Sequence, residues 1–331
     1  MGVRWGLLST AAINDPVIAA ARASDRVEIV AVASRERERA ERYASDNGIA
    51  RAHATYEALL DDPEVEAVYI PLPNSMHVEW TTRALEAGKH VLVEKPFSRR
   101  AAEVDEVCAL AERQGLVLAE GFMWRHHPQT ARLLELARGG AIGRLLIVRA
   151  AFSFPLDELR GPDDTRFRPE LDGGGLMDVG CYCVSAIRLL SGEEPVRVHA
   201  EQVLAPTGVD VVLAATMRMP SGVLGQFDCG FLSRHRDELE IIGDQGTLFL
   251  DDPWHAREPV IELRRDSGVE RIEITPADSY RLELEDVSDA IRGRSPLIAG
   301  PDDARAQVRA IEALYRSAET RLAVDLAAQG P

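Results

Sequence analysis

The sequence predicts an α/β protein with two domains. Residues 1–121 should form a doubly wound parallel sheet, and residues 122–331 an α+β domain with a large, mainly antiparallel, open-faced sheet. In the first part, short runs rich in Val, Ile and Leu alternate with amphipathic helical patterns, which is typical of buried parallel strands. In the second part, longer runs alternate apolar and polar residues, as in antiparallel sheets with one wetter face. A chain of 331 residues is long enough for two domains.

The N-terminal part should contain alternating strands and helices. The expected strands are 3–8, 27–33, 65–70, 90–94 and 116–120, and the expected helices are 15–24, 36–47, 75–87 and 100–114. Such sheets bind ligands at the carboxyl ends of their strands, near the point where the strand order reverses. The segments that follow these strands are therefore the first places to look for a site.

The C-terminal part should be dominated by strands. We expect strands at 145–154, 196–205, 209–219, 222–231, 238–251 and 260–266, with helices at 128–138 and 176–190. The chain should end in a helix with one apolar stripe, because apolar residues recur there at three- and four-residue steps. The members of this stripe are Ala304, Val308, Ile311, Tyr315, Ala318 and Leu322.

Composition excludes several classes of protein. A net charge of −16 and a pI of about 5.0 argue against nucleic acid or an anionic membrane as a partner. No apolar run approaches the roughly 18 residues of a membrane span, and the N-terminus has no secretory pattern. The cysteines (Cys108, Cys181, Cys183 and Cys229) form no zinc pattern, so we expect buried thiols in a reducing cytoplasm.

The segment after the first strand reads GLLSTAAIN, residues 6–14. A dinucleotide-binding Rossmann loop has glycines where the backbone nears the pyrophosphate. Only one glycine is present here, but the other residues are small and two carry hydroxyl groups that can bind phosphate. We predict a dinucleotide loop, with an ordinary strand–helix turn as the alternative. The predicted binding residues are Gly6, Ser9, Thr10, Ala11, Ala12 and Ile13.

The end of the second strand predicts the type of dinucleotide. An NAD site has an acidic residue there for the ribose hydroxyl, whereas an NADP site has cationic and small polar groups for the 2′-phosphate. Here Ser34 and Arg35 follow the strand, and Arg39 lies one turn into the next helix. We expect NADP(H), with NAD as the less favoured cofactor; the alternative is a solvated helix start.

Lysine is rare in this chain. Of 38 basic side chains only Lys89 and Lys95 are lysines. We expect Lys89 to be solvated at the end of a helix, as a by-product of a coding bias towards arginine. Lys95 differs, because it ends a buried strand and precedes a proline, and arginine cannot replace a compact ammonium in a tight site. Lys95 is therefore a candidate functional residue, with chance as the alternative.

Several motifs resemble the Gfo/Idh/MocA oxidoreductase family over nearly the whole chain. They are WGLLSTAAI (5–13), PLPNSMH (71–77), AGKHVLVEKP (87–96), FMWRHHPQ (122–129) and GGGLMDVGCY (173–182). The resemblance implies that Lys95 is the active-site lysine beside the nicotinamide, and that the Lys95–Pro96 bond is cis. It also implies a set of residues that line the cofactor or the nicotinamide ribose. These are Leu72, Pro73, Asn74, His77 and Glu94, with Arg168 as a further contact.

Asp178 and Tyr182 should form the substrate end of the site. They are four residues apart on a predicted helix and so share a face. A tyrosine at position 182 resembles the glucose–fructose oxidoreductase, dihydrodiol dehydrogenase and sugar ketoreductase branches rather than inositol dehydrogenases. Arg125 and His127 are further substrate-binding candidates, although a structural role for the histidine is as well supported.

The resemblance implies hydride transfer between nicotinamide and a CHOH or C=O carbon of a sugar or sugar derivative. Tyr182 would give or take the hydroxyl proton, assisted by the positive charge of Lys95, and Asp178 would orient the substrate or Lys95. We expect no metal in this reaction, since the cofactor supplies its hard chemistry. Alternatives are a dehydrogenase or reductase of a non-sugar ring, such as a trans-dihydrodiol, and an NADP-sensing regulator without turnover. We expect a homodimer or homotetramer, joined through an apolar open face of the second sheet.

Overall fold

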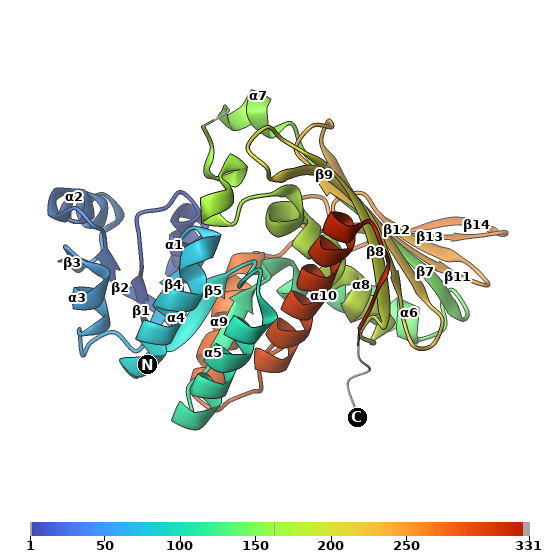
Figure 1. Ribbon diagram of the computed structural model, residues 1–331. Coiled ribbons are helices and arrows are strands. Elements are labelled where there is room, and N and C mark those ends of the chain that lie inside the picture. The colour runs from blue at the N-terminus through green and yellow to red at the C-terminus, as the bar shows by residue number, and fades with distance from the viewer. Residues whose placement is uncertain (1, 162, 327–331) are drawn as a thin grey trace. The chain divides into compact units, whose positions relative to one another are not determined.

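The computed structural model describes residues 2–161 and 163–326, and these form two compact units (Figure 1). One unit contains residues up to His126 together with Asp278–Arg305, and the other contains His127–Ala277 and the chain from Ala306 onward. A functional division after residue 121 stays a prediction. Among the described residues no helix is long and apolar enough to cross a membrane.

The first unit is built on a six-stranded sheet in the order β3-β2-β1-β4-β5-β6. All neighbouring strands are parallel, so the doubly wound sheet is confirmed, with its order reversing between β1 and β4. Two short elements, β3 and α3, were not expected. The elements are β1 (Val3–Leu7), α1 (Asn14–Arg22), β2 (Val27–Ala33), α2 (Arg37–Asn47), β3 (Arg51–His53), α3 (Tyr56–Leu60), β4 (Ala67–Ile70), η1 (Asn74–Met76), α4 (His77–Glu86), β5 (His90–Glu94), α5 (Ala101–Gln114), β6 (Leu118–Gly121), η2 (Met123–His126) and α9 (Ser279–Ile291).

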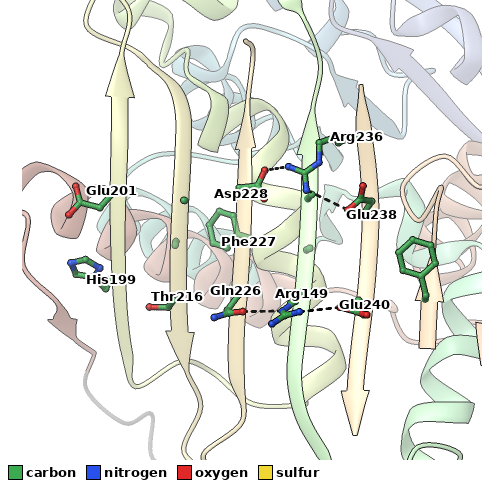
Figure 2. A pocket seen from close by; sticks show the side chains of 15 residues that line it. Arg149, His199, Glu201, Thr216, Gln226, Phe227, Asp228, Arg236, Glu238 and Glu240 are labelled. Carbon is green, nitrogen blue, oxygen red and sulfur yellow. Dashed lines mark hydrogen bonds and ion pairs between the residues drawn. The ribbon is translucent and has the colours of Figure 1, made fainter. Parts of the chain in front are cut away.

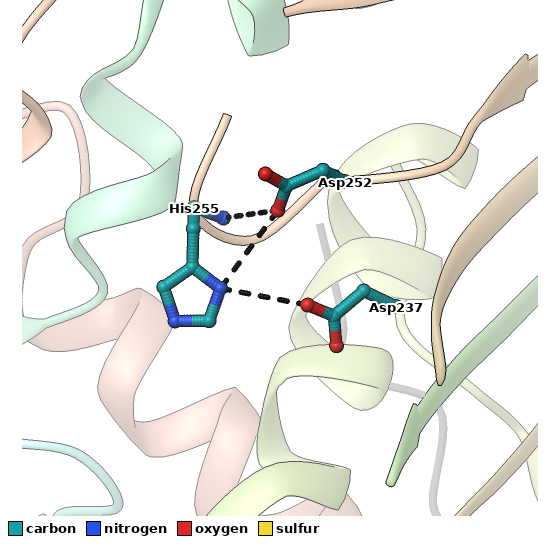
Figure 3. A group of neighbouring side chains, drawn as sticks. All are labelled: Asp237, Asp252 and His255. Atoms are coloured by element: carbon teal, nitrogen blue, oxygen red, sulfur yellow. Dashed lines mark hydrogen bonds and ion pairs between the residues drawn. The ribbon is translucent and has the colours of Figure 1, made fainter. Parts of the chain in front are cut away.

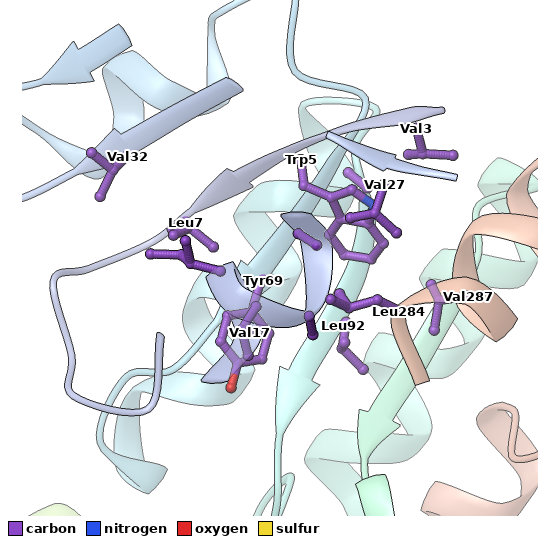
Figure 4. Close-up of a cluster of buried hydrophobic side chains, with 14 of the residues drawn as sticks. Val3, Trp5, Leu7, Val17, Val27, Val32, Tyr69, Leu92, Leu284 and Val287 are labelled. Atoms are coloured by element: carbon purple, nitrogen blue, oxygen red, sulfur yellow. The ribbon is translucent and has the colours of Figure 1, made fainter. Parts of the chain in front are cut away.

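Helix α9 belongs to the first unit although it lies far along the chain. Leu284 and Val287 pack in the same buried cluster as Trp5 of β1 (Figure 4). The indole Nε1 of Trp5 also donates to Oγ of Ser288 at 3.2 Å, and both groups are buried. The apolar face of α9 therefore completes the core that β1 begins.

The second unit contains a nine-stranded sheet in the order β14-β13-β12-β11-β7-β10-β9-β8-β15. Among the strands that the structure describes, only β7 and β10 of this sheet pair in parallel, so the prediction of a mainly antiparallel sheet is confirmed. The elements are α6 (Pro128–Arg138), β7 (Leu145–Ser153), α7 (Leu156–Arg160), η3 (Thr165–Phe167), η4 (Pro169–Leu171), η5 (Leu176–Gly180), α8 (Cys181–Ser191), β8 (Arg197–Leu204), β9 (Asp210–Arg218), β10 (Leu224–Gly230), β11 (Arg236–Gly243), β12 (Thr247–Leu250), β13 (Val260–Arg265), β14 (Gly268–Glu273), α10 (Pro301–Thr320, which begins in the first unit) and β15 (Val324–Asp325).

The two faces of the nine-stranded sheet differ in character. The apolar rows, such as Leu239 and Ile241 of β11, are buried on the face that α8 covers. The opposite face carries charged and polar side chains around a hollow of about 540 Å³ (Figure 2). The expectation of an apolar open face is therefore wrong, because strand alternation directs the apolar residues to the covered side.

Three further expectations need correction. Residues 238–251 form two strands, because Gly243 and Gly246 close a tight turn between β11 and β12 with a backbone hydrogen bond. Strand β14 was not expected. Leu322 does not belong to the apolar stripe of α10: the helix ends at Thr320, and Leu322 is 67% exposed.

Lys89 is not solvated, contrary to expectation. Its side chain is buried, and Nζ donates to the carbonyl oxygens of Asp62 and Val65, both at 2.8 Å. Burial lowers the pKa of this ammonium. Lys89 therefore ties the end of α4 to the segment that enters β4, and its three donors fit two carbonyl groups that converge on one point.

Replacing Lys89 by methionine should destabilise the protein, because two buried carbonyl groups would lose their donor while the apolar stem is kept. Hydrogen bonds from charged groups contribute about 1.5–3 kcal/mol each, so we expect a loss of about 2–3 kcal/mol of unfolding free energy, measured by urea denaturation. Arg113→Met, at an exposed site on α5, is the matched control. Equal midpoints for the two variants would contradict this assignment.

Candidate functional site

The loop between β1 and α1 has the features of a phosphate-binding turn. The hydroxyl of Ser9 accepts from the backbone N–H of Ala11 at 3.2 Å, and the Asn14 side chain donates to the Ser9 carbonyl at 2.8 Å. The N-terminus of α1 has no side-chain cap, which leaves backbone N–H groups for an anion. Gly6 is required by packing, since a Cβ there would lie 2.7 Å from Cδ2 of Leu59.

The end of β2 carries a donor set suited to a phosphate. Ser34 is buried and its hydroxyl accepts from the backbone of Glu36 at 3.3 Å. Arg35 and Arg39 are exposed. Burial raises the pKa of the nearby Tyr56, and the positive charges of the two arginines partly offset this rise. Two guanidinium groups beside a hydroxyl fit a 2′-phosphate better than a ribose hydroxyl.

His77 connects the segments that follow β4 and β5. It is fully buried, with Nδ1 2.9 Å from the Pro96 carbonyl oxygen and Nε2 2.8 Å from that of Leu72. Burial lowers its pKa to about 4, whereas the two carbonyl oxygens favour a ring with a proton on both nitrogens. This geometry favours positioning of the loop that contains Leu72, Pro73 and Asn74 over direct cofactor contact by the imidazole.

The segment that carries Lys95 is held by two carboxylates, of which Glu120 is buried and Glu94 is partly exposed. The Glu94 side chain accepts from the Tyr69 hydroxyl at 2.6 Å and from the backbone N–H of Lys95 at 3.3 Å. Glu120 of β6 accepts from the backbone N–H of Phe97 at 2.8 Å. The Lys95–Pro96 peptide bond is cis, as the resemblance implied. Neighbouring strands thus fix the backbone on both sides of Lys95 at the carboxyl end of β5.

Arg125 and His127 have structural partners. Arg125 is buried and donates to the Asp303 carboxylate at 2.6 Å, within the first unit. His127 is buried at the start of α6, where Nδ1 accepts from the backbone N–H of Gln129 at 3.0 Å, and burial lowers its pKa. These contacts support a structural role for His127 at the start of α6. They also show that the guanidinium of Arg125 forms an ion pair with Asp303.

The GGG motif allows a close approach of buried groups in the second unit. A Cβ on Gly173 would collide with the carbonyl of Arg166, and one on Gly174 with the carboxylate of Asp210. Gly174 also has a φ of 127°, a conformation that side chains disfavour. The Asp210 carboxylate, itself buried, accepts from the backbone N–H of Leu176 at 2.6 Å. It thereby caps the helix that carries Asp178 and Tyr182.

That helix does not begin as expected. Residues Leu176–Gly180 form a π-helical turn, and the α-helix α8 starts at Cys181. π-turns are uncommon and often occur at functional sites. Asp178 lies in this turn and accepts from Nε of Arg166 at 2.7 Å; its charge raises the pKa of that guanidinium. Arg168, the arginine we had expected to bind cofactor, is exposed.

Tyr182 lies among aromatic rings. It is 8% exposed, and its ring centroid is 5.3 Å from Phe152 and 5.7 Å from Trp254. Phe152 and Trp254 stack at 5.9 Å, and the Trp254 indole donates to the Ala151 carbonyl at 3.2 Å. The position of the tyrosine is therefore fixed by packing on β7 and on the connection after β12.

Each unit therefore assembles one set of the predicted residues. The first brings together the phosphate loop, the end of β2 and the segment around Lys95, and the second brings Asp178 together with Arg166. Sequence reasoning missed several supporting residues because their partners are distant in the chain. These are Tyr69, Glu120, Asp210 and Trp254.

Comparison with known proteins decides the family. Residues 3–122 match the oxidoreductase family with an NAD-binding Rossmann fold, and residues 130–249 match the GFO/IDH/MocA C-terminal domain. The chain belongs to the Gfo/Idh/MocA family. The resemblance seen in the sequence motifs is thereby confirmed across both units.

Individual Gfo/Idh/MocA proteins match over most of their length. D-xylose 1-dehydrogenase (NADP(+)) 2 of Haloferax volcanii is 38% identical, over 97% of this chain and 99% of that protein. Trans-1,2-dihydrobenzene-1,2-diol dehydrogenase of Mus musculus is 35% identical over 80% of this chain and 79% of its own. A 3-ketoreductase from Actinomadura kijaniata, solved with NADP and TDP-benzene, is 28% identical with a TM-score of 0.89 and covers 96% of this chain and 98% of its own.

Proposed function

We propose that this protein is an NADP(H)-dependent oxidoreductase that transfers hydride between the nicotinamide and a CHOH or C=O carbon of a sugar or sugar derivative. The observation that carries the proposal is the fixed position of Lys95 at the carboxyl end of β5, beside Glu94 and the His77 bridge. Family membership and the NADP-dependent relatives support the same reaction class.

The residues of the first unit fit NADP. The loop from Ser9 to Ile13 and the uncapped start of α1 would hold the pyrophosphate, and Ser34, Arg35 and Arg39 the 2′-phosphate. When bound, the cofactor supplies or accepts the hydride. The chain has only to orient the substrate and move one proton.

We assign the proton to Tyr182 and the supporting charge to Lys95. A phenol has an ordinary pKa of about 10, so a cation close to it is needed to favour the phenolate at neutral pH. Lys95 can meet this need and donate to the same substrate oxygen. Asp178 accepts from Arg166, and we assign to Asp178 the orientation of the substrate hydroxyl groups or of Lys95.

Matched structures of the same 3-ketoreductase include a lysine-to-alanine variant and a tyrosine-to-phenylalanine variant. Those two residue types are the ones that this proposal places at the reacting oxygen. The similarity to a dihydrodiol dehydrogenase makes non-sugar rings, such as trans-dihydrodiols, the second candidate class of substrate. The aromatic rings around Tyr182 are buried in the second unit and do not decide between the classes. A panel of aldoses, keto sugars and a trans-dihydrodiol, assayed by NADPH absorbance, distinguishes the two. Turnover of the dihydrodiol alone would overturn the sugar assignment.

NADP should be preferred over NAD by at least tenfold in kcat/KM, because a charge-assisted contact to phosphate contributes about 1.5–3 kcal/mol. Arg35→Ala should lower kcat/KM with NADP while leaving that with NAD unchanged. Arg42→Ala, exposed farther along α2, is the matched control. Equal kcat/KM for the two cofactors in the parent protein would sink this assignment.

Lys95→Ala and Tyr182→Phe should each lower kcat by about 10²–10⁴-fold, the usual contribution of an acid–base group. Both should keep near-parental NADPH affinity in a fluorescence titration, since the Ser34/Arg35 end of the site is unchanged. Lys95→Arg keeps the charge but alters its shape, and we expect it to be nearly as damaging as alanine. If a Lys95→Arg enzyme turned over at the parental rate, a positive charge of any shape would be sufficient at position 95, and the proposed role of Lys95 would be wrong.

We further propose a cytoplasmic homodimer or homotetramer that pairs through the open face of the nine-stranded sheet. On this face Arg236 pairs with Asp228 at 2.5 Å, and Arg149 lies 3.6 Å from Glu240 (Figure 2). A face with both signs of charge can complement itself about a two-fold axis.

Light scattering should give a dimer or tetramer mass at micromolar protein. Ala214→Arg, at an exposed position on β9 of this face, should shift the mass towards the monomer because it adds a bulky charge to the interface. Glu106→Arg, exposed on α5, should leave the mass unchanged. A monomeric parent protein would contradict the proposal.

A further inference from the structure

A group of metal-ligating side chains lies outside the proposed reaction site. Asp237 comes from β11, and Asp252 and His255 come from the connection between β12 and β13 (Figure 3). One carboxylate oxygen of each aspartate and Nδ1 of the histidine lie within 4.8 Å of one another. Nδ1 is 3.6 Å from Oδ2 of Asp237 and 3.8 Å from Oδ1 of Asp252.

The Asp237 carboxylate needs a counter-charge. Its side chain is 4% exposed and points to the covered face of the sheet. Among the described residues neither of its oxygens has a hydrogen-bond partner, and Nδ1 of His255 has none either. A buried carboxylate whose oxygens accept no hydrogen bond is costly, so a group that joins these three atoms would relieve that cost.

Asp252 is already oriented for this task. Its two carboxylate oxygens accept from the backbone N–H groups of His255 at 3.2 Å and Arg257 at 2.8 Å. Each oxygen keeps a further lone pair. These bonds fix the carboxylate in place, as outer hydrogen bonds do for the ligands of metal sites.

We propose that Asp237, Asp252 and His255 bind a divalent transition-metal ion, and zinc fits best. Zinc lies about 2.0–2.2 Å from nitrogen and oxygen ligands, which spaces two ligands of one ion about 3–4 Å apart; the two shorter separations here meet this condition. An imidazole ligand favours zinc over magnesium or calcium. His235 is half exposed, with Nδ1 3.8 Å from Asp237 Oδ2, and is not counted among the ligands because it does not belong to the group of three.

The ion would hold the connection that contains Trp254. That ring packs against Tyr182, and Phe152 contacts both Tyr182 and the His255 ring. A metal joining β11 to this connection would therefore stiffen the packing around Tyr182. The binding site itself does not depend on the proposed function.

The test uses chelator-treated full-length protein and zinc chloride. Zinc should bind with one-to-one stoichiometry in calorimetry and raise Tm by about 5 °C at a hundredfold excess over Kd. His255→Ala and Asp237→Asn should abolish both effects. Asp237→Asn also removes the unpaired charge, so without metal its Tm should equal or exceed that of the parent. His53→Ala, which removes a histidine 3.1 Å from Asp62 in the first unit, is the matched control and should keep the zinc response.

Cobalt(II) provides a spectroscopic check. Its bound spectrum should lack thiolate-to-cobalt charge transfer, since the cysteines are free thiols and none of them belongs to this group of ligands among the described residues. A zinc response that persists in His255→Ala would overturn the proposal, and so would a parent protein without a zinc response.

Discussion

The buried carboxylate of Asp210 fixes the part of the second unit that carries Asp178 and Tyr182. One oxygen accepts from the backbone N–H of Leu176, and the other accepts from the Tyr315 hydroxyl of α10 at 2.9 Å. A buried carboxylate is tolerated only when its lone pairs are used, so the helix start and α10 are placed together. The glycines before the helix follow from this constraint, because any side chain at Gly174 would occupy the space of the carboxylate.

The first unit uses the same physical solution at strand ends. Glu120, His77 and Lys89 are buried polar side chains that pair with backbone groups where the chain leaves or enters the sheet. Unpaired backbone groups at such points would be costly. The result is that the segment around Lys95 is rigid although it is not part of a strand or helix. Precise placement of a reacting group depends on this kind of support.

Local patterns in the sequence were sufficient for the longer strands of the first unit and for its helices α1, α2, α4 and α5, because short apolar runs and helical periodicity are local properties. The same patterns placed Lys95, Glu94 and Ser34 at or just after strand ends, as the structure has them, while the roles of these residues stay predictions. The patterns failed where a partner is distant in sequence: nothing near Lys89 reveals that two carbonyl groups 24 and 27 residues away converge on it. The π-turn at Asp178 was missed for a similar reason. The glycines that precede it make room for the carboxylate of Asp210, which is distant in the sequence. The turn between β11 and β12 did have a local signal, the GDQG sequence, which interrupts the strand pattern.

The scarcity of lysine gains a physical meaning from these two sites. A chain with 36 arginines keeps lysine at two positions, and one of them is buried where a planar guanidinium could not direct its donors at two converging carbonyl groups. Coding bias explains why lysine is rare but not why it survives at such a place. The shape of the cation decides the outcome at Lys89, and our proposal applies the same criterion to Lys95, which directly follows the buried strand β5. In a chain so rich in arginine, a lysine that remains indicates a site whose geometry requires a compact ammonium group.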